Sequence, residues 1–164
     1  MPCSLDLGKL TAPELLALHA RLADTLRERG ITRTSNNPTG DLAEHLFCKA
    51  FEWQQENNSK AHFDAVAANG DKYQIKGRRI TRHNKSRQLG AIRNFEDQGF
   101  SFLAGVLFNE DYTVLRAAII PFAVVKEQAK FIAHTNSHKF MLNEDVWKAE
   151  RVEDVTDRLR AILL

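Results

Sequence analysis

Residues 63–79 read FDAVAANGDKYQIKGRR, and in this stretch the hydrophobic period changes from helical to extended. Apolar and polar side chains alternate on both sides of Asn69-Gly70, a dipeptide that favours a tight turn between two strands. The stretch therefore predicts a β-hairpin. Because side chains alternate along a strand, Gln74 and Lys76 share one face of its second strand and Ile75 lies on the other.

The length of the hairpin loop decides whether Asp64 joins Gln74 and Lys76. A two-residue loop at Asn69-Gly70 would turn Asp64 away from both side chains. A three-residue loop, Asn69 to Asp71, would pair Asp64 with Lys76 and place all three polar side chains on one face. A joint site at these residues therefore requires an odd-length loop or a β-bulge.

These side chains suit a divalent metal ion and a phosphate. The carboxylate of Asp64 and the amide oxygen of Gln74 are hard donors of the kind that Mg²⁺ prefers, and the main-chain carbonyl of Ile75 can add another. Lys76 can hold or deprotonate an attacking water, or neutralise charge on a phosphate. The alternative is a solvated strand face on which Asp64 forms an ion pair with Lys76.

Glu44 is a further candidate for the same site. It lies on a helix expected over 41–55, at helical spacing from Phe47 and Cys48. A carboxylate against an apolar surface costs free energy unless it has a partner, and a metal site or Lys76 would provide one. The alternative is a capping box in which Glu44 closes the N-terminus of its helix.

The chain has a net charge of +2, but this charge is unevenly distributed. Residues 72–95 contain eight Lys and Arg and no Asp or Glu, so the rest of the chain carries a net charge of −6. Such a basic block points to a polyanion, most often nucleic acid, although a solvated loop without a partner is the alternative. The candidate phosphate contacts are Arg78, Arg79, Arg82, His83, Lys85 and Arg87.

The remaining pattern predicts a single domain with a mixed sheet covered by helices. We expect an N-terminal helix and a polar connection over 1–38, a core over 39–120 and a helical C-terminal part over 121–164. The further segments expected are strands over 100–108 and 112–120 and helices over 121–131 and 154–164.

Composition excludes several classes of protein. Hydrophobic residues make up 43% of the 164 residues and charged residues 27%, which is ordinary for a globular protein. No apolar run is long enough to span a membrane, and the first residues lack the features of a secretory signal. The two cysteines form no disulfide framework, so we expect a cytoplasmic protein. His134 and His138 have a spacing that suits zinc, but the loop-forming residues between them favour a structural or surface role.

The succession of Glu44, Asp64 and Gln74-Ile75-Lys76 resembles the PD-(D/E)XK nuclease superfamily, which has a restriction-endonuclease-like fold. Its members carry a Glu on a helix, an Asp on a strand, and an acidic residue, any residue and Lys on the next strand. The run QIKGRR over 74–79 is similar to small bacterial members with Gln in the acidic position. The resemblance covers about residues 39–120.

This resemblance implies an α/β fold with a central mixed sheet flanked by helices, and a DNA endonuclease that depends on Mg²⁺, with Mn²⁺ as a substitute. Asp64, Gln74 and Ile75 would bind the metal, Glu44 would bind it or orient a water, and Lys76 would position the attacking water. Cutting both strands of DNA commonly takes two active sites, so a homodimer is compatible with this interpretation.

Two positions depart from the pattern of the superfamily. Phe63 replaces a proline, and Gln74 replaces a carboxylate, which lowers metal affinity unless Glu44 compensates. The alternatives are therefore a non-catalytic nucleic-acid-binding protein of the same fold, or a soluble interaction domain.

Overall fold

The structure is a computed structural model that describes residues 6–57, 62–93 and 95–162. The chain divides at Pro38 into two compact units, Met1–Pro38 and Thr39–Leu164, and the boundary coincides with the end of the expected N-terminal segment. Within the described residues, no helix has both the length and the apolar character needed to cross a membrane.

The first unit is built around helix α1 (Ala12–Glu28), which follows a short 3₁₀ helix, η1 (Leu7–Lys9). A capping box starts α1, because the main-chain N and the hydroxyl of Thr11 donate to Glu14 Oε2 at 2.8 and 2.7 Å. Gly30 adopts a φ of 69° just after the helix, where a left-handed residue ends it.

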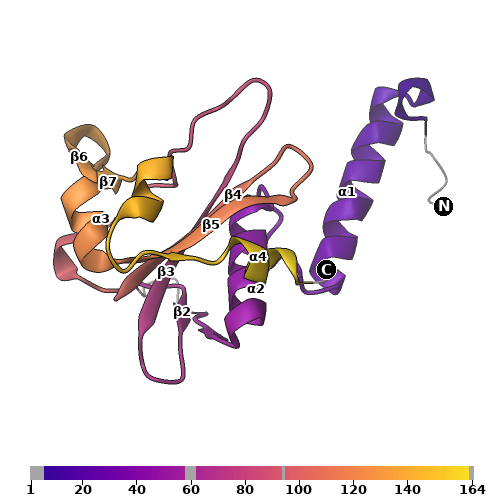
Figure 1. Ribbon diagram of the computed structural model, residues 1–164. Coiled ribbons are helices and arrows are strands. Elements are labelled where there is room, and N and C mark those ends of the chain that lie inside the picture. The colour runs from indigo at the N-terminus through magenta and orange to yellow at the C-terminus, as the bar shows by residue number, and fades with distance from the viewer. Residues whose placement is uncertain (1–5, 58–61, 94, 163–164) are drawn as a thin grey trace. The chain divides into compact units, whose positions relative to one another are not determined.

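The second unit is an α/β structure with a mixed sheet, as the sequence predicts (Figure 1). In the described residues the sheet has six strands in the order β1-β2-β3-β4-β5-β8, with β3 and β4 parallel and the other neighbours antiparallel. The elements are α2 (Thr39–Phe51), β1 (Gln54–Gln55), β2 (Ala65–Val66), β3 (Lys72–Arg79), η2 (Phe95–Asp97), β4 (Phe102–Phe108), β5 (Val114–Pro121), α3 (Phe122–Gln128), β6 (Lys130–Ile132), η3 (Ala133–Thr135), β7 (Ser137–Lys139), η4 (Glu144–Lys148), β8 (Glu153–Asp154) and α4 (Thr156–Arg160).

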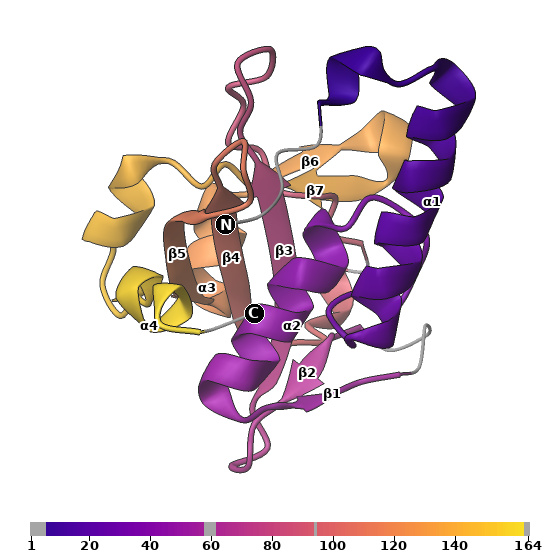
Figure 2. The same ribbon diagram turned by 90° about the vertical axis from the view of Figure 1, so that its right-hand side faces the viewer.

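Helix α2 covers one face of the sheet (Figure 2). Gly77 of β3 permits this close approach, because a Cβ atom there would lie 2.9 Å from the carbonyl oxygen of Thr39 and 3.0 Å from Ala43 Cβ. Tyr73 and Ile75 alternate with polar residues along β3 and are buried on the side of Gly77. The α2 face of β3 is therefore apolar.

The opposite face of the sheet carries the larger apolar core, which includes Leu89, Leu103, Leu107, Ile120, Phe140 and Leu142. A Cβ atom on Gly105 would lie 3.1 Å from side-chain atoms of both Leu89 and Leu142, so Gly105 faces this core. Lys76 pairs with Gly105 in the parallel ladder and therefore lies on the same face.

Two expectations about helices were wrong. The second helix ends at Phe51 and not near residue 55, because Glu52 takes a φ of 57° and the chain turns into β1. The part after residue 121 is not helical throughout, because β6 and β7 pair as a separate antiparallel ribbon and β8 adds to the sheet edge. Tertiary strand pairing overrides the helical pattern in both places.

Candidate active site at the edge of strand β3

The hairpin between β2 and β3 has a three-residue loop. Ala65 pairs with Tyr73, and Ala67 N donates to Asp71 O at 2.9 Å, which leaves residues 68–70 as the loop. The odd loop length that a joint site requires is therefore present. The register differs from the expected one by two residues and brings Asp64 beside Gln74 instead of Lys76.

Asp64 binds directly to β3 through its carboxylate. Its Oδ2 accepts hydrogen bonds from Gln74 Nε2 and from the main-chain N of Ile75, both at 2.6 Å. Strand β2 begins at Ala65, opposite Tyr73, and does not extend to the position opposite Ile75. The N–H of Ile75 therefore donates to the carboxylate of Asp64 instead of to a main-chain carbonyl. The bond fixes Asp64 at the edge of the sheet.

This edge gathers three kinds of oxygen donor. Gln74 uses its amide nitrogen toward Asp64, which leaves its amide oxygen as an acceptor. In a strand, the N–H and C=O of one residue point to the same side, so the carbonyl of Ile75 is directed toward the edge where Asp64 lies. A carboxylate, an amide oxygen and a main-chain carbonyl form a donor set of the kind that Mg²⁺ prefers.

Lys76 lies two residues further along β3, on the face opposite α2. Its stem is half-buried beside Gly90, whose Cβ position would be 3.6 Å from Lys76 Cδ. With the described residues, Lys76 makes no hydrogen bond or ion pair, so the alternative in which it simply neutralises Asp64 is not what the structure shows. The ammonium group therefore has no anionic partner among the described residues.

Glu44 approaches the same edge from the other side of the sheet. Its Oε2 accepts a hydrogen bond from Gln55 Nε2 at 2.7 Å. Gln55 pairs with Ala65, on the face that α2 covers, whereas Gln74 and Lys76 face away from α2. The helix begins at Thr39, so Glu44 does not occupy the third position of a capping box at Asp41.

Sequence patterns missed Glu56, which lies next to Asp64. Its main-chain N donates to Asp64 O at 2.8 Å, so the chain continues the β1–β2 pairing by one residue. Because Gln55 faces α2, alternation directs Glu56 to the face of Gln74 and Lys76. The polar run after Trp53 could have signalled this strand, but the expected helix extended across it.

Few carboxylates lie at the candidate site among the described residues. In the parts of the chain that the structure describes, no group of three or more His, Cys, Asp or Glu side chains is arranged to hold a metal ion. The donors at β3 fit Mg²⁺ in kind, with Asp64 as the carboxylate and neutral oxygens from Gln74 and Ile75.

Half of the expected nucleic-acid contacts have a structural role. Arg78 Nε donates to Ser86 O at 3.2 Å, and Arg79 Nε donates to Glu110 O at 2.8 Å. Arg87 forms an ion pair with Glu144 at 2.5 Å, and this hydrogen bond lowers the pKa of the Glu144 carboxyl. These three arginines shape the segment between β3 and β4.

The other three candidates, Arg82, His83 and Lys85, are exposed together on this segment. Figure 1 shows the segment reaching past the end of the sheet beside the β4–β5 turn. Arg82 Nε donates to His83 Nε2 at 3.0 Å and lies 4.0 Å from a carboxylate oxygen of Glu110. The exposed tip therefore remains basic.

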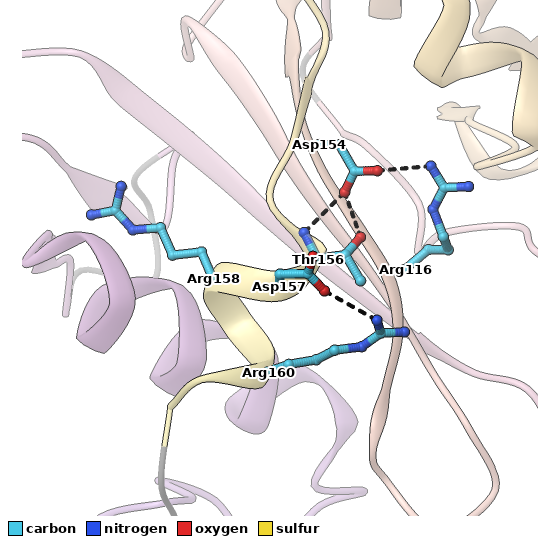
Figure 3. Close-up of a pocket in the computed structure, with 6 residues that line it drawn as sticks. All are labelled: Arg116, Asp154, Thr156, Asp157, Arg158 and Arg160. Atoms are coloured by element: carbon cyan, nitrogen blue, oxygen red, sulfur yellow. Dashed lines mark hydrogen bonds and ion pairs between the residues drawn. The ribbon is translucent and has the colours of Figure 1, made fainter.

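A pocket of about 390 Å³ beside α4 contains three arginines but serves the fold (Figure 3). Arg116 forms ion pairs with Glu144 at 2.5 Å and with Asp154 at 2.9 Å. Arg160 donates to the carbonyl oxygens of Val114 and Leu115 at 3.1 and 3.0 Å. These bonds hold the C-terminal segment against β5, so we do not take this pocket as the active site.

Comparison with models of known protein families finds no match to this chain, and no curated protein matches it significantly.

Proposed function

We propose that this chain is a Mg²⁺-dependent DNA endonuclease with a restriction-endonuclease-like fold. The observation that carries the proposal is the bonding of Asp64 to Gln74 and Ile75 where β3 extends past β2, with Lys76, which has no ion pair among the described residues, next along the strand. A mixed sheet flanked by helices is also the class of fold that the sequence resemblance implies.

Each residue of the site has a distinct role in this proposal. Asp64, the amide oxygen of Gln74 and the carbonyl of Ile75 hold the metal, with Glu44 supporting β1 through Gln55. Bound Mg²⁺ would stabilise the negative charge that develops on the phosphate and make the attacking water more acidic. Lys76 donates to that water or to a phosphate oxygen, which orients in-line attack and offsets the developing charge.

The exposed basic tip supports DNA as the substrate. Arg82 lies 4.0 Å from a carboxylate oxygen of Glu110, and Lys85 is exposed. Each of the two side chains can therefore neutralise a backbone phosphate. Such an enzyme would act in the cytoplasm, and cutting both strands of a duplex would take two copies of the chain.

A supercoiled plasmid incubated with the protein tests this proposal. We expect nicking in Mg²⁺, none in EDTA, and a loss of about 100-fold or more in Asp64→Asn, which removes the charge of the carboxylate. Asp71→Asn is the matched control, because Asp71 is an aspartate of the same hairpin that bonds within the turn. Equal rates for the two variants, or no cleavage with Mg²⁺ or Mn²⁺, would contradict the proposal.

The small number of carboxylates at the candidate site, among the described residues, favours a second candidate function, that of a DNA-binding protein without nuclease activity. Gln74 carries no charge, so metal binding at β3 depends more on Asp64 than it would with a carboxylate at position 74. A pure binding protein would retain DNA equally in Mg²⁺ and in EDTA and leave the plasmid intact.

A further inference from the structure

A second pocket, of about 200 Å³, lies between η2 and the β6–β7 ribbon. It is formed where the ribbon packs beside the segment that follows the basic tip. Its lining residues are Phe95, Glu96, Asp97, Phe131, Asn136 and His138.

Aromatic rings form the wall of this pocket. The His138 ring stacks on Phe95 with centroids 4.2 Å apart, and Phe131 lies 5.2 Å from His138 at an angle of 51°. Phe95 is buried, but Phe131 is 58% exposed although it lies on a strand. An exposed aromatic ring next to a stacked pair offers a surface for another planar group.

Besides His138, the polar side chains that line the pocket are two carboxylates, Glu96 and Asp97, and the amide of Asn136. Glu96 and Asp97 place exposed carboxylates at its edge, and Glu96 Oε1 lies 4.0 Å from His138 Nε2. No Lys or Arg is among its lining residues in the described chain. Phosphate is therefore a poor ligand for this pocket, whereas a planar group that carries N–H donors is a good one.

The pocket is close to the candidate active site. Ile92 bridges to His138, and Gly90, two residues earlier, lies against the stem of Lys76. Lys76, Gly90, Ile92 and His138 therefore form a continuous run of neighbours from the candidate active site to the pocket.

We propose that this pocket binds one unpaired nucleobase that carries an exocyclic amino group, from the DNA strand held at Lys76. The base stacks on the exposed ring of Phe131 beside His138, and the carboxylates of Glu96 and Asp97 accept hydrogen bonds from its amino group. Cytosine, adenine and guanine meet this requirement, and thymine does not. The inference rests on the proposed nuclease function and names a feature of its substrate.

An organic cation would also suit aromatic rings and carboxylates, but two features favour a base. Arg93 and Lys130 are exposed beside the pocket residues in sequence, where they can contact the phosphates on either side of an extruded base. His138 of the pocket also pairs with Ile92, two residues after the Gly90 that lies beside Lys76, so a DNA strand bound at Lys76 would pass near the pocket.

The test uses a DNA duplex with one extrahelical 2-aminopurine, whose fluorescence is quenched by stacking, in EDTA so that no strand is cut. We expect quenching on binding to the wild-type protein. Phe131→Ala should lose the quenching and bind about tenfold more weakly, since stacking on an aromatic side chain contributes about 1–3 kcal/mol per base. Met141→Ala, which changes an exposed apolar residue outside the pocket, should behave as wild type.

Competition with unlabelled duplexes tests the base preference, and we expect extrahelical cytosine to displace the probe at a concentration several-fold lower than extrahelical thymine. Quenching that is absent in the wild type, or equal in Phe131→Ala, overturns the proposal. Displacement by tetramethylammonium with no preference among bases also overturns it, in favour of a cation site. Plasmid cleavage without quenching would contradict only the proposal that this pocket binds a base. Quenching without cleavage would contradict only the nuclease proposal.

Discussion

Gln74 is the position at which the candidate metal site differs most from a pair of carboxylates. Its amide nitrogen donates to Asp64 at 2.6 Å, so in the absence of a cation the two side chains attract each other. Two carboxylates at this distance would repel each other until a cation lay between them. The glutamine therefore stabilises the metal-free protein and weakens metal binding.

The variant Gln74→Glu tests this account of the residue. We expect its melting temperature in EDTA to fall below that of the wild type, because a hydrogen bond is replaced by a like-charge contact. We also expect Mg²⁺ to raise its melting temperature more, with a metal affinity higher by about tenfold or more. Thermal unfolding across a Mg²⁺ titration measures both effects, and an affinity unchanged from wild type would show that position 74 does not face the metal.

At the scale of elements, the site depends on the close packing of α2 against β3. Gly77 is the point of closest approach, with its Cβ position 2.9 Å from a main-chain carbonyl of Thr39. A main-chain atom of a helix cannot move away as a flexible side chain would. The packing thus holds β3, and with it Lys76 on the adjacent position, at a fixed distance from α2.

The variant Gly77→Ala should lower the free energy of unfolding by about 1–3 kcal/mol, because the added methyl group overpacks the interface. Gly40→Ala is the matched control: Gly40 lies in α2 with nothing within 4 Å of its Cβ position, so alanine there should be neutral or stabilising by up to about 1 kcal/mol. Urea unfolding of the two variants gives the comparison, and equal destabilisation would contradict the packing argument.

The attachment of the C-terminal segment to β5 should depend on pH. The hydrogen bond from Arg87, together with the charges of Arg116 and Arg87, lowers the pKa of Glu144 below its ordinary value of 4.5. Burial raises the pKa of Asp154, but hydrogen bonds from Thr156 and the charge of Arg116 outweigh it and hold the pKa below 3.8. Carboxyls with lowered pKa values stabilise the fold above their ordinary pKa, and this stabilisation is lost as the pH falls through the lowered values.

The free energy of unfolding should therefore decrease as the pH falls below about 4.5, and it should decrease less steeply in Arg116→Ala, which lacks the common partner of both carboxyls. Urea unfolding at several pH values between about 6 and 3 measures the two slopes. Parallel slopes for the wild type and the variant would show that these ion pairs do not contribute.

For the whole molecule, the uneven charge predicts how DNA binding responds to salt. On a fully paired duplex, from which no base is extruded, we expect Arg82, Lys85 and Lys76 to meet phosphates, whereas Arg87 is held by Glu144. Three neutralised phosphates give a slope of about −3 in a plot of log affinity against log salt concentration.

Lys85→Ala should reduce the magnitude of this slope by about 1 without changing the stability of the protein, because Lys85 is exposed. Arg87→Ala should lower stability and leave the slope nearly unchanged. Fluorescence anisotropy of labelled duplex DNA over a salt series, with an unfolding curve for each variant, distinguishes the two. A slope near zero would contradict DNA binding through this surface.

The features of the fold that depend on local chemistry could be predicted from the sequence. The capping box at Thr11 and Glu14 and the buried strand over Phe102–Phe108 are examples, and so is the α/β class. The features that depend on tertiary pairing could not. Glu52 ends α2 in a left-handed conformation that glycine usually adopts, and the hairpin register follows from a loop that starts one residue before the Asn-Gly signal.

The same division applies to the candidate site. The polar alternation of Gln74 and Lys76 lies within one strand, so the sequence predicts it and the structure agrees. The bond between Asp64 and Gln74 depended on the register, and the bond between Glu44 and Gln55 depended on a strand that the sequence assigned to a helix. The partner of Arg79 lies in the distant β4–β5 turn and the partner of Arg87 in the distant 3₁₀ helix η4, and no local pattern reveals either.

Cleavage by Lys76→Ala, measured as the rate of nicking of supercoiled plasmid by excess protein in Mg²⁺, tests the central claim most directly. Lys72→Ala is the control, because it removes the same charge from an exposed position on the same face of β3. We predict that Lys76→Ala loses about 100-fold or more of the rate while Lys72→Ala stays close to wild type. Equal rates for the two variants, or no nicking by the wild type, would contradict an active site at Asp64, Gln74 and Lys76.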